Sequence, residues 1–273
     1  MEKIDTGTEH LIFEKEKGIA ILTMNRPEAR NAMSGEMNEA MKATLEEVEL
    51  DPNIRCVVLT GAGKGFCAGG DVKGMASSGD GTVGDNTIDA AIHRQRDHQR
   101  ATAGKLFKMP KPTIAALPGA AAGAGLSYAL ACDLRIMANN AIMTTAFAKV
   151  GFSGDYGGSY FMTQLIGSAK ARELYFLSDR VSADEALNLG LTNWVCEPEK
   201  LMEKTMEIAS QLANGPSVAY RYMKENLNRA MNGEVDECLD LEATHHIHCG
   251  QTEDHRNATK AFVEKKEPVF KGK

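Results

Sequence analysis

The alternation of hydrophobic and polar residues predicts a chain that begins with paired strands. Residues 11–16 (LIFEKE) and 19–24 (IAILTM) alternate apolar and polar positions on either side of a Lys-Gly turn, which is a β-hairpin pattern. Residues 36–50 carry apolar residues at helical spacing, with Ser34 as the expected N-cap. Residues 54–61 (IRCVVLTG) have the continuous apolar run of a buried strand. Strands and helices therefore alternate from the start of the chain.

This alternation continues to about residue 160, after which the pattern is almost entirely helical. The further expected elements are a helix over 91–108, a strand over 112–119, two short strands within 134–147, and a long last helix over about 234–266. Residues 74–90 are polar and glycine-rich, so we expect a mobile loop there. The pattern predicts an α/β fold with a mainly parallel sheet, followed by a helical region that serves as a cap or an oligomerisation arm.

Composition narrows the class of protein. The chain has 273 residues, of which 43% are hydrophobic and 25% charged, as is usual for a globular protein with a full core. The net charge of −6 argues against general nucleic-acid binding, which needs a basic face. The N-terminal ten residues lack a signal-peptide core, and the apolar tract at 120–132 is too short and glycine-rich to span a membrane. The six cysteines form no CxxC pair, which favours reduced thiols and a cytoplasmic location.

Three glycine-rich loops share one order of elements: apolar strand, loop, then helix. Their sequences are TGAGKGFCAGGD (60–71), LPGAAAGAGLSYA (117–129) and GFSGDYGGSYF (151–161). Small residues at such turns often do no more than permit close packing of a helix on a strand. A dinucleotide-binding fingerprint is disfavoured because GAAAGAG lies mid-chain rather than after the first strand, and no GKS or GKT is present for a phosphate-binding loop.

A third interpretation takes two of these loops together. If the amides of Ala68 and Ala124 converge, they form an oxyanion hole with two N–H donors aimed at one carbonyl oxygen. Small residues are then required because a side chain would keep the substrate away from the main chain. This arrangement stabilises an enolate or a tetrahedral oxyanion.

Four segments, in their order along the chain, carry a resemblance to a known family. They are NRPEARNAMS, VVLTGAGKGFCAGGDV, PGAAAGAGLSYALACDLRIM, and the long stretch from GFSGDYGGSYF to LTNWV. Together they closely resemble the crotonase family of enoyl-CoA hydratases and isomerases, over about residues 10–270. The resemblance implies a crotonase-like spiral of ββα units over 1–200 with an acyl-CoA site, and a C-terminal helical trimerisation region over 201–273. It also implies a coenzyme A thioester as substrate, no cofactor beyond that moiety, and a homotrimer or dimer of trimers.

The same resemblance implies a set of site residues. Ala68 and Ala124 take the positions whose amides hold the thioester carbonyl. The acyl-CoA path is bordered by residues of the first two glycine loops, of the segment before them, and of the last helix, where a solvated helix face is the alternative for the two lysines. The expected residues are Arg26, Arg30, Cys67, Gly69, Gly70, Gly123, Gly125, Ser127, Phe147, Lys265 and Lys266. Cys67 is interpreted as a packing residue.

The sequence departs from the family at the catalytic carboxylates. Hydratases of this family use two glutamates, because water addition needs one group for the water and one for the α-proton. Ser127 and Phe147 stand at those positions here. The remaining candidate is Asp155, where isomerases, dehalogenases and some hydrolases of the family place an aspartate. A carboxylate beside an apolar acyl pocket should have a raised pKa. The alternative role for Asp155 is that of a helix N-cap.

These residues favour double-bond isomerisation, with Asp155 moving a proton between two carbons of an acyl-CoA. Two alternatives stay open. One is a hydratase or hydrolase whose water is positioned by Asp155, Ser127 or a histidine such as His93 or His98. The other is a non-catalytic coenzyme A-binding scaffold. The HHIHC run at 245–249 puts metal-ligand side chains on one helical face, but without a fourth ligand we expect no metal site.

Overall fold

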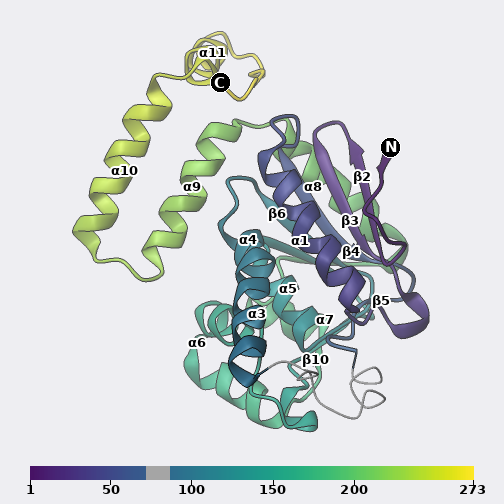
Figure 1. The fold of residues 1–273 in the computed structure, drawn as a ribbon. Helices are drawn as coiled ribbons and strands as arrows, with labels where there is room; N and C mark the ends of the chain where they lie inside the picture. Colours follow the sequence, from purple (N-terminus) through teal and green to yellow (C-terminus); the bar gives the residue numbers. More distant parts are fainter. Residues whose placement is uncertain (72–86) are drawn as a thin grey trace.

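A computed structural model describes residues 1–71 and 87–273, and its strands form two sheets (Figure 1). The larger sheet has the order β1-β2-β3-β4-β6-β8-β11, and the smaller one has the order β10-β9-β7-β5. The strands are β1 (Glu2–Ile4), β2 (Leu11–Glu16), β3 (Ile19–Met24), β4 (Cys56–Gly61), β5 (Gly65–Cys67), β6 (Thr113–Leu117), β7 (Ala120–Ala122), β8 (Leu134–Ala138), β9 (Ile142–Thr144), β10 (Val181–Ser182) and β11 (Trp194–Cys196). From β3 to β11 the larger sheet is parallel, as are β5, β7 and β9, so the predicted parallel arrangement is confirmed.

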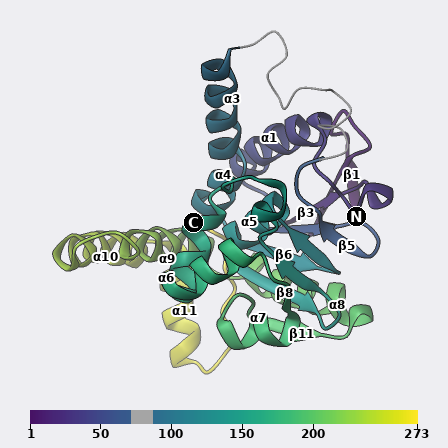
Figure 2. The ribbon, with the colours of Figure 1, turned by 90° about the horizontal axis from the view of Figure 1, so that it is seen from below.

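Helices cover both faces of the larger sheet. They are α1 (Gly35–Leu50), α3 (Ile88–Ala101), α4 (Ala103–Lys108), α5 (Ala124–Ala131), α6 (Gly158–Leu177), α7 (Ala183–Leu189), α8 (Leu201–Ala213), α9 (Ser217–Ala230), α10 (Val235–Gly250) and α11 (Glu253–Val263). Successive residues of β3 point to opposite faces. Ile19 and Ile21 pack with α8, whereas Ala20 and Leu22 join the core under α1, α4 and α5. Figure 2 shows α1 and α5 on one side of the sheet and α8 on the other.

Most elements expected from the sequence are present, and several boundaries are corrected. The hairpin, β4 and the Ser34 cap are confirmed; the Ser34 hydroxyl accepts a hydrogen bond from the Met37 amide. The helix expected over 91–108 is split into α3 and α4, because Thr102 has non-helical backbone angles. The helix expected over 234–266 is two helices, since the Thr252 side chain caps a new start at α11. Five short strands, β1, β5, β7, β10 and β11, were not expected; β5 and β7 lie within the glycine-rich loops.

The glycine-rich segment 74–90, which the sequence predicts as a mobile loop, lies for the most part outside the described residues. Its last residues are described and are helical, because α3 starts at Ile88 with the Thr87 hydroxyl accepting from the Ala90 amide. The predicted loop is therefore too long at its C-terminal end.

Helices α9 and α10 lie side by side and project from the body of the molecule, and α11 follows the end of α10 (Figures 1 and 2). The division predicted between residues 200 and 201 stays a prediction; α8, which follows that point, packs on the sheet. The buried ammonium of Lys224 ties α9 to the body. It donates to the carbonyls of Leu106 and Lys111 and to Asp133 Oδ2, 2.8 Å away. Asp133 also accepts hydrogen bonds from Thr113 of β6, so it joins α9 to the larger sheet.

Replacing Lys224 with methionine should lower the free energy of unfolding by about 3 kcal/mol, because it removes the cation paired with the Asp133 carboxylate and the donor to the carbonyls of Leu106 and Lys111. Chemical denaturation followed by circular dichroism measures this. The matched control is Lys204→Met, which removes an exposed pair with Glu207 and should change stability by less than about 0.5 kcal/mol. Equal effects of the two substitutions would contradict the assigned role of Lys224.

The structure also bears on membrane insertion and on the state of the cysteines. Within the described part of the chain, every helix is too short or too polar to cross a lipid bilayer. All six cysteines are free thiols, three of them buried.

Candidate active site

The first two glycine loops meet because the strands before them pair. Strand β5 runs parallel to β7, with Cys67 opposite Ala121, so Ala68 and the start of α5 follow side by side. The contact between the loops leaves no space for side chains. A Cβ on Gly69, whose φ is 93°, would lie 2.9 Å from the Ala122 carbonyl oxygen and 3.3 Å from the Ala124 nitrogen.

Gly125 is packed equally closely. A Cβ at this position would lie 2.4 Å from the Cys67 carbonyl oxygen and 2.6 Å from the Cys67 Cβ. Glycine is thus required on both sides of the contact, and the two loops that the sequence pairs as an oxyanion hole are brought together in the structure.

The two N–H groups of the expected oxyanion hole, those of Ala68 and Ala124, differ in their hydrogen-bond acceptors. Ala124 is the first residue of α5, so its N–H has no acceptor within the helix and lies at the positive end of the helix dipole. The Ala68 N–H donates to the Arg30 carbonyl at 3.0 Å. For both amides to hold one thioester oxygen, Ala68 must exchange this carbonyl for the substrate or share its hydrogen between the two acceptors.

The segment that supplies this carbonyl is held by Asn31, a residue that the sequence analysis missed. Arg30 and Asn31 both have positive φ, at 52° and 56°. The buried Asn31 side chain donates to the carbonyls of Ala62 and Gly65 and accepts from the Arg26 amide. The only signal in the sequence is an asparagine between two turns, which is too common to identify its role.

The two arginines expected along the coenzyme A path occupy different settings. The Arg26 guanidinium donates to the Ala32 carbonyl and lies 3.0 Å from Asp71 Oδ2, so it fastens the segment before the first glycine loop to the end of that loop. The Arg30 side chain is exposed and available to an anion. Gly70, one residue before Asp71, forms a bridge with Met33.

The third glycine loop presents Asp155. Its side chain is partly buried, and Oδ1 is inaccessible to solvent and has no hydrogen-bond partner in the part of the chain that the structure describes. Burial raises the pKa of the Asp155 carboxyl to about 6, as the sequence led us to expect. The N-cap interpretation is wrong: the cap of α6 is Gly157, and no side chain caps this helix. The carboxylate is therefore not used to begin the helix.

Asp155 lies close to the loop that carries Ala68. Burial raises the pKa of the Cys67 thiol to about 12, and the charge of Asp155 adds to this rise. Cys67 is fully buried and accepts a hydrogen bond from the Gly69 amide, so its interpretation as a packing residue is confirmed. Burial, and then the charge of Asp155, also raise the pKa values of Tyr156 and Tyr175.

Tyr175 is a second residue that the sequence analysis missed. It lies in the part of α6 beyond Gly167, where the helix is interrupted by non-helical backbone angles. Its ring stacks on Phe147 with centroids 5.8 Å apart, and its edge packs on the Asp155 loop, 3.1 Å from the position that a Cβ on Gly154 would take. The contact joins residues that no local pattern relates.

Ser127 and Phe147, at the two positions where the resemblance implies the hydratase glutamates, have side chains that pack. Ser127 is buried, and its hydroxyl donates to the Gly123 carbonyl at 3.3 Å. A Cβ on Gly158 would lie 2.3 Å from Ser127 Oγ and 2.7 Å from Tyr175 Oη, so this region has no free space. Phe147 is buried as well and covers Gly123, whose Cβ would lie 3.6 Å from its ring.

The histidines and lysines considered from the sequence lie in different places. His98 Nε2 contacts the Asn38 carbonyl at 3.0 Å and Nδ1 contacts the Tyr156 hydroxyl at 3.1 Å, so both ring nitrogens are engaged. His93 is exposed on α3. Lys265 and Lys266 follow α11 in the sequence. Figure 1 shows α11 well away from β5 and α5. Within one chain the structure does not bring them to the site.

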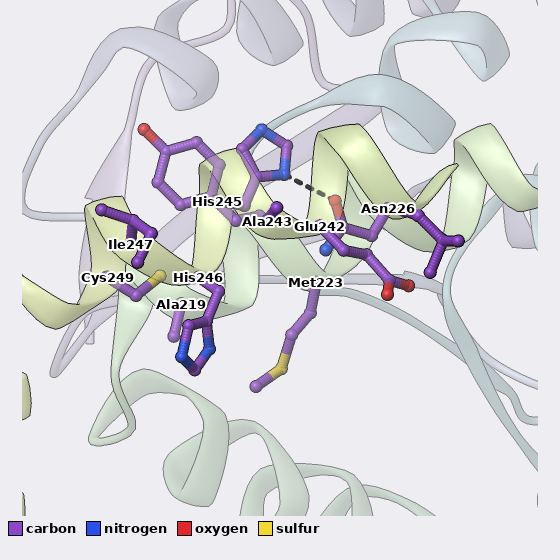
Figure 3. Close-up of a pocket in the computed structure, with 11 residues that line it drawn as sticks. Ala219, Met223, Asn226, Glu242, Ala243, His245, His246, Ile247 and Cys249 are labelled. Atoms are coloured by element: carbon purple, nitrogen blue, oxygen red, sulfur yellow. Dashed lines mark hydrogen bonds between the residues drawn. The ribbon is translucent and has the colours of Figure 1, made fainter. Parts of the chain in front are cut away.

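A separate pocket of about 630 Å³ lies between α9 and α10 (Figure 3). Its lining is mostly apolar; Met223 and His246 project from the two helices toward the same side. His245 stacks on Tyr222 and contacts Asn226 Oδ1 through Nδ1. Across residues 1–71 and 87–273 no group of His, Cys, Asp and Glu side chains is arranged to hold a metal ion, the HHIHC run included.

Comparison with known proteins decides the family. Residues 14–273 match the family model described as Enoyl-CoA hydratase/isomerase. The chain belongs to this family. A 1,2-epoxyphenylacetyl-CoA isomerase of Escherichia coli (strain K12) is 36% identical over 97% of this chain and 99% of its own length. A short-chain-enoyl-CoA hydratase of Clostridium acetobutylicum is 35% identical over 94% of this chain and 95% of its own length.

Solved structures of the enoyl-CoA hydratase/isomerase family have the same fold. An enoyl-CoA hydratase from Polaromonas sp. JS666 superposes with a TM-score of 0.88 at 31% identity, covering 96% of this chain and 99% of that one. The crotonase-like α/β fold with a helical C-terminal region, predicted from the sequence, is therefore confirmed. As a member of the enoyl-CoA hydratase/isomerase family, the chain is an acyl-CoA-processing enzyme.

Proposed function

We propose that the protein is an acyl-CoA double-bond isomerase in which Asp155 carries the proton. The observation that supports this most directly is that Asp155 is the carboxylate presented by the third loop, whereas Ser127 and Phe147 pack where hydratases need glutamates. A pKa of about 6 lets Asp155 accept a proton from carbon and return it near neutral pH. One carboxylate is enough for a reaction that adds no water.

The proposed reaction begins with the thioester carbonyl between the amides of Ala68 and Ala124. Asp155 removes a proton from the allylic carbon, and the electron pair of that C–H bond moves through the double bond onto the thioester oxygen as an enolate. The two amides stabilise this oxygen by a few kcal/mol each. The protonated Asp155 then delivers its proton to the other end of the conjugated system, which shifts the double bond and regenerates the carboxylate.

The test is product analysis in water labelled with both deuterium and oxygen-18. A panel of 3-enoyl-CoA, 2-enoyl-CoA and 1,2-epoxyphenylacetyl-CoA, the last named for the E. coli relative, covers the isomerase and hydratase alternatives. We expect a product with a shifted double bond and no oxygen-18, and deuterium at carbon only in those turnovers in which the protonated Asp155 exchanges with solvent before it returns the proton. Oxygen-18 in the product would contradict the proposal in favour of a hydratase or hydrolase, and tight binding without turnover would favour a scaffold.

Replacing Ser127 with glutamate should fail to install hydration, because the position is filled. Serine Oγ already lies 2.3 Å from the place of a Cβ on Gly158, so a longer, charged side chain must displace α6. We expect a loss of about 2 kcal/mol in unfolding free energy and no oxygen-18 product. Ser127→Ala, the control, should keep stability within about 1 kcal/mol, because it removes one neutral hydrogen bond. Efficient hydration by Ser127→Glu would refute this view of the site.

We also propose that the protein works as a homotrimer or a dimer of trimers, in the cytoplasm, and with no cofactor beyond the coenzyme A moiety. The projecting helices α9 and α10 expose large apolar side chains that a monomer would leave in water, among them Leu227, Leu239 and Ile247. Assembly would also let Lys265 and Lys266 reach the coenzyme A of a neighbouring subunit, which they do not approach in their own chain. The free thiols support the cytoplasmic location.

Ile247→Glu should shift the protein toward smaller species in sedimentation velocity, because it places a charge on the apolar face of α10. The control is Leu50→Glu, which introduces the same change at an exposed apolar residue of α1 on the body. A monomeric wild-type protein, or an unchanged assembly in Ile247→Glu, would count against this interface.

A further inference from the structure

Among the described residues, no hydrogen-bond donor reaches the buried Oδ1 of Asp155. The position of the carboxylate therefore depends largely on the backbone of its loop. That backbone is unusual: φ is positive at Gly154 (116°), Tyr156 (47°) and Gly157 (78°). A non-glycine residue with positive φ costs free energy and persists where the surroundings hold it in place.

The contact that holds Tyr156 comes from α3. The Gln99 side chain accepts a hydrogen bond from the Tyr156 amide, with Oε1 and N 2.6 Å apart. This amide belongs to the peptide bond that follows Asp155. The Asp155 carbonyl, at the other end of the same peptide bond, accepts from the Gly158 amide at 3.0 Å. Both ends of this peptide unit are therefore fixed, one by the loop itself and one by Gln99.

The neighbour of Gln99 fixes the Tyr156 side chain as well. His98 Nε2 must donate to the Asn38 carbonyl, so Nδ1 is the acceptor for the Tyr156 hydroxyl in a neutral ring. The ring of Tyr156 packs edge-on against His98, with centroids 5.8 Å apart, and at a tilt against Tyr128, with centroids 5.1 Å apart. Because Asn38 lies on α1, the connection runs from α1 through α3 to the loop.

We propose that Gln99 is a positioning residue for the reaction, which holds Asp155 at the substrate by accepting the Tyr156 amide hydrogen bond. The inference rests on the proposed role of Asp155 and extends it to a residue on another element. Gln99 does not touch the reacting atoms. It acts by keeping the loop in a conformation that the loop's own sequence does not favour.

Gln99→Met tests this, because methionine has a similar length but accepts no hydrogen bond from an amide. We expect kcat to fall about 10-fold to 100-fold, as for an ångström-scale displacement of a catalytic group, with KM nearly unchanged. Gln99→Glu keeps an acceptor at the same reach and should retain most of kcat. Its added negative charge should shift the acidic limb of the pH–rate profile to higher pH. The other ionisable side chains close to Asp155 are Cys67, Tyr128, Tyr156 and Tyr175. Arg96→Met, on the exposed face of α3, is the control and should match the wild type.

The double variant with Asp155→Asn separates this proposal from the proposed function. If Gln99 acts through Asp155, Gln99→Met should cause no further loss of activity in the Asp155→Asn background. Full activity of Gln99→Met, or equal losses in Gln99→Met and Gln99→Glu, would overturn the positioning role while leaving Asp155 in place. Full activity of Asp155→Asn alone would overturn the proposed function instead. Thermal unfolding of each variant shows whether a loss reflects misfolding.

Discussion

Asp155→Asn should lower kcat by about 10³-fold, because the amide can neither accept nor return a proton. Binding of acyl-CoA should be nearly unchanged, since asparagine has the same size and the amides of Ala68 and Ala124 are untouched. Steady-state kinetics and direct titration of a product or substrate analogue measure the two quantities separately. A variant that keeps its kcat would remove Asp155 from the mechanism.

The same substitution should make the protein more stable. Burial raises the pKa of Asp155 from 3.8 to about 6, so the folded state binds the proton more tightly than the unfolded state. The stability of the wild type therefore falls as the pH rises from about 4 to about 6, and the full penalty is present above that range. At pH 8 we expect Asp155→Asn to gain up to about 3 kcal/mol in unfolding free energy over the wild type, and at pH 3 to gain little. A gain that does not vary with pH would point to a different cause.

Gly125→Ala is the second substitution that should strongly lower kcat. A methyl group there would lie 2.4 Å from the Cys67 carbonyl oxygen and 2.6 Å from the Cys67 Cβ, and neither atom can move without the Cys67 backbone. The two glycine loops must move apart, so the amides of Ala68 and Ala124 can no longer hold one oxygen. We expect a fall in kcat of about 10² to 10³-fold and a loss of roughly 1–3 kcal/mol in stability.

Gly35→Ala is the matched control for this substitution. Gly35 lies at the start of α1 with no other atom within 4 Å of its Cβ position, so alanine should leave both activity and stability close to the wild type. Activity of Gly125→Ala within a fewfold of the wild type would show that the loops tolerate separation, and would argue against an oxyanion hole at this point.

The sequence predicts a feature of this fold correctly when the feature depends on residues that are close together in the sequence. The Ser34 cap and the β2–β3 hairpin were predicted because each depends on residues a few positions apart. The single helix expected over 234–266 was wrong because the hydrophobic pattern continues across residues 251–252, where a threonine side chain ends one helix and begins another. Apolar spacing alone does not report such a cap in the middle of a long pattern.

The residues of the candidate site also differ in whether the nearby sequence allows them to be predicted. Ala68 and Ala124 were predicted because each lies in a glycine-rich loop between a strand and a helix, and Asp155 was predicted from the family resemblance. Gln99 and Tyr175 were missed because their contacts are made in three dimensions; Gln99 lies 57 positions from Tyr156 in the sequence. A glutamine in a polar helix and a tyrosine in an amphipathic one carry no local sign of these partners.

The spiral arrangement of the loops also determines when a working site can exist. Ala68, Ala124 and Asp155 come from successive layers of the fold, and the pairing of β5, β7 and β9 must be complete before they meet. Such long-range pairing is formed slowly compared with the helices around it. On the ribosome the first glycine-rich loop is made well before its partners, and until they arrive it has the earlier segment around Arg30 and Asn31 to hold it but not the second loop. Enzymatic activity should therefore be among the last properties that the new chain acquires.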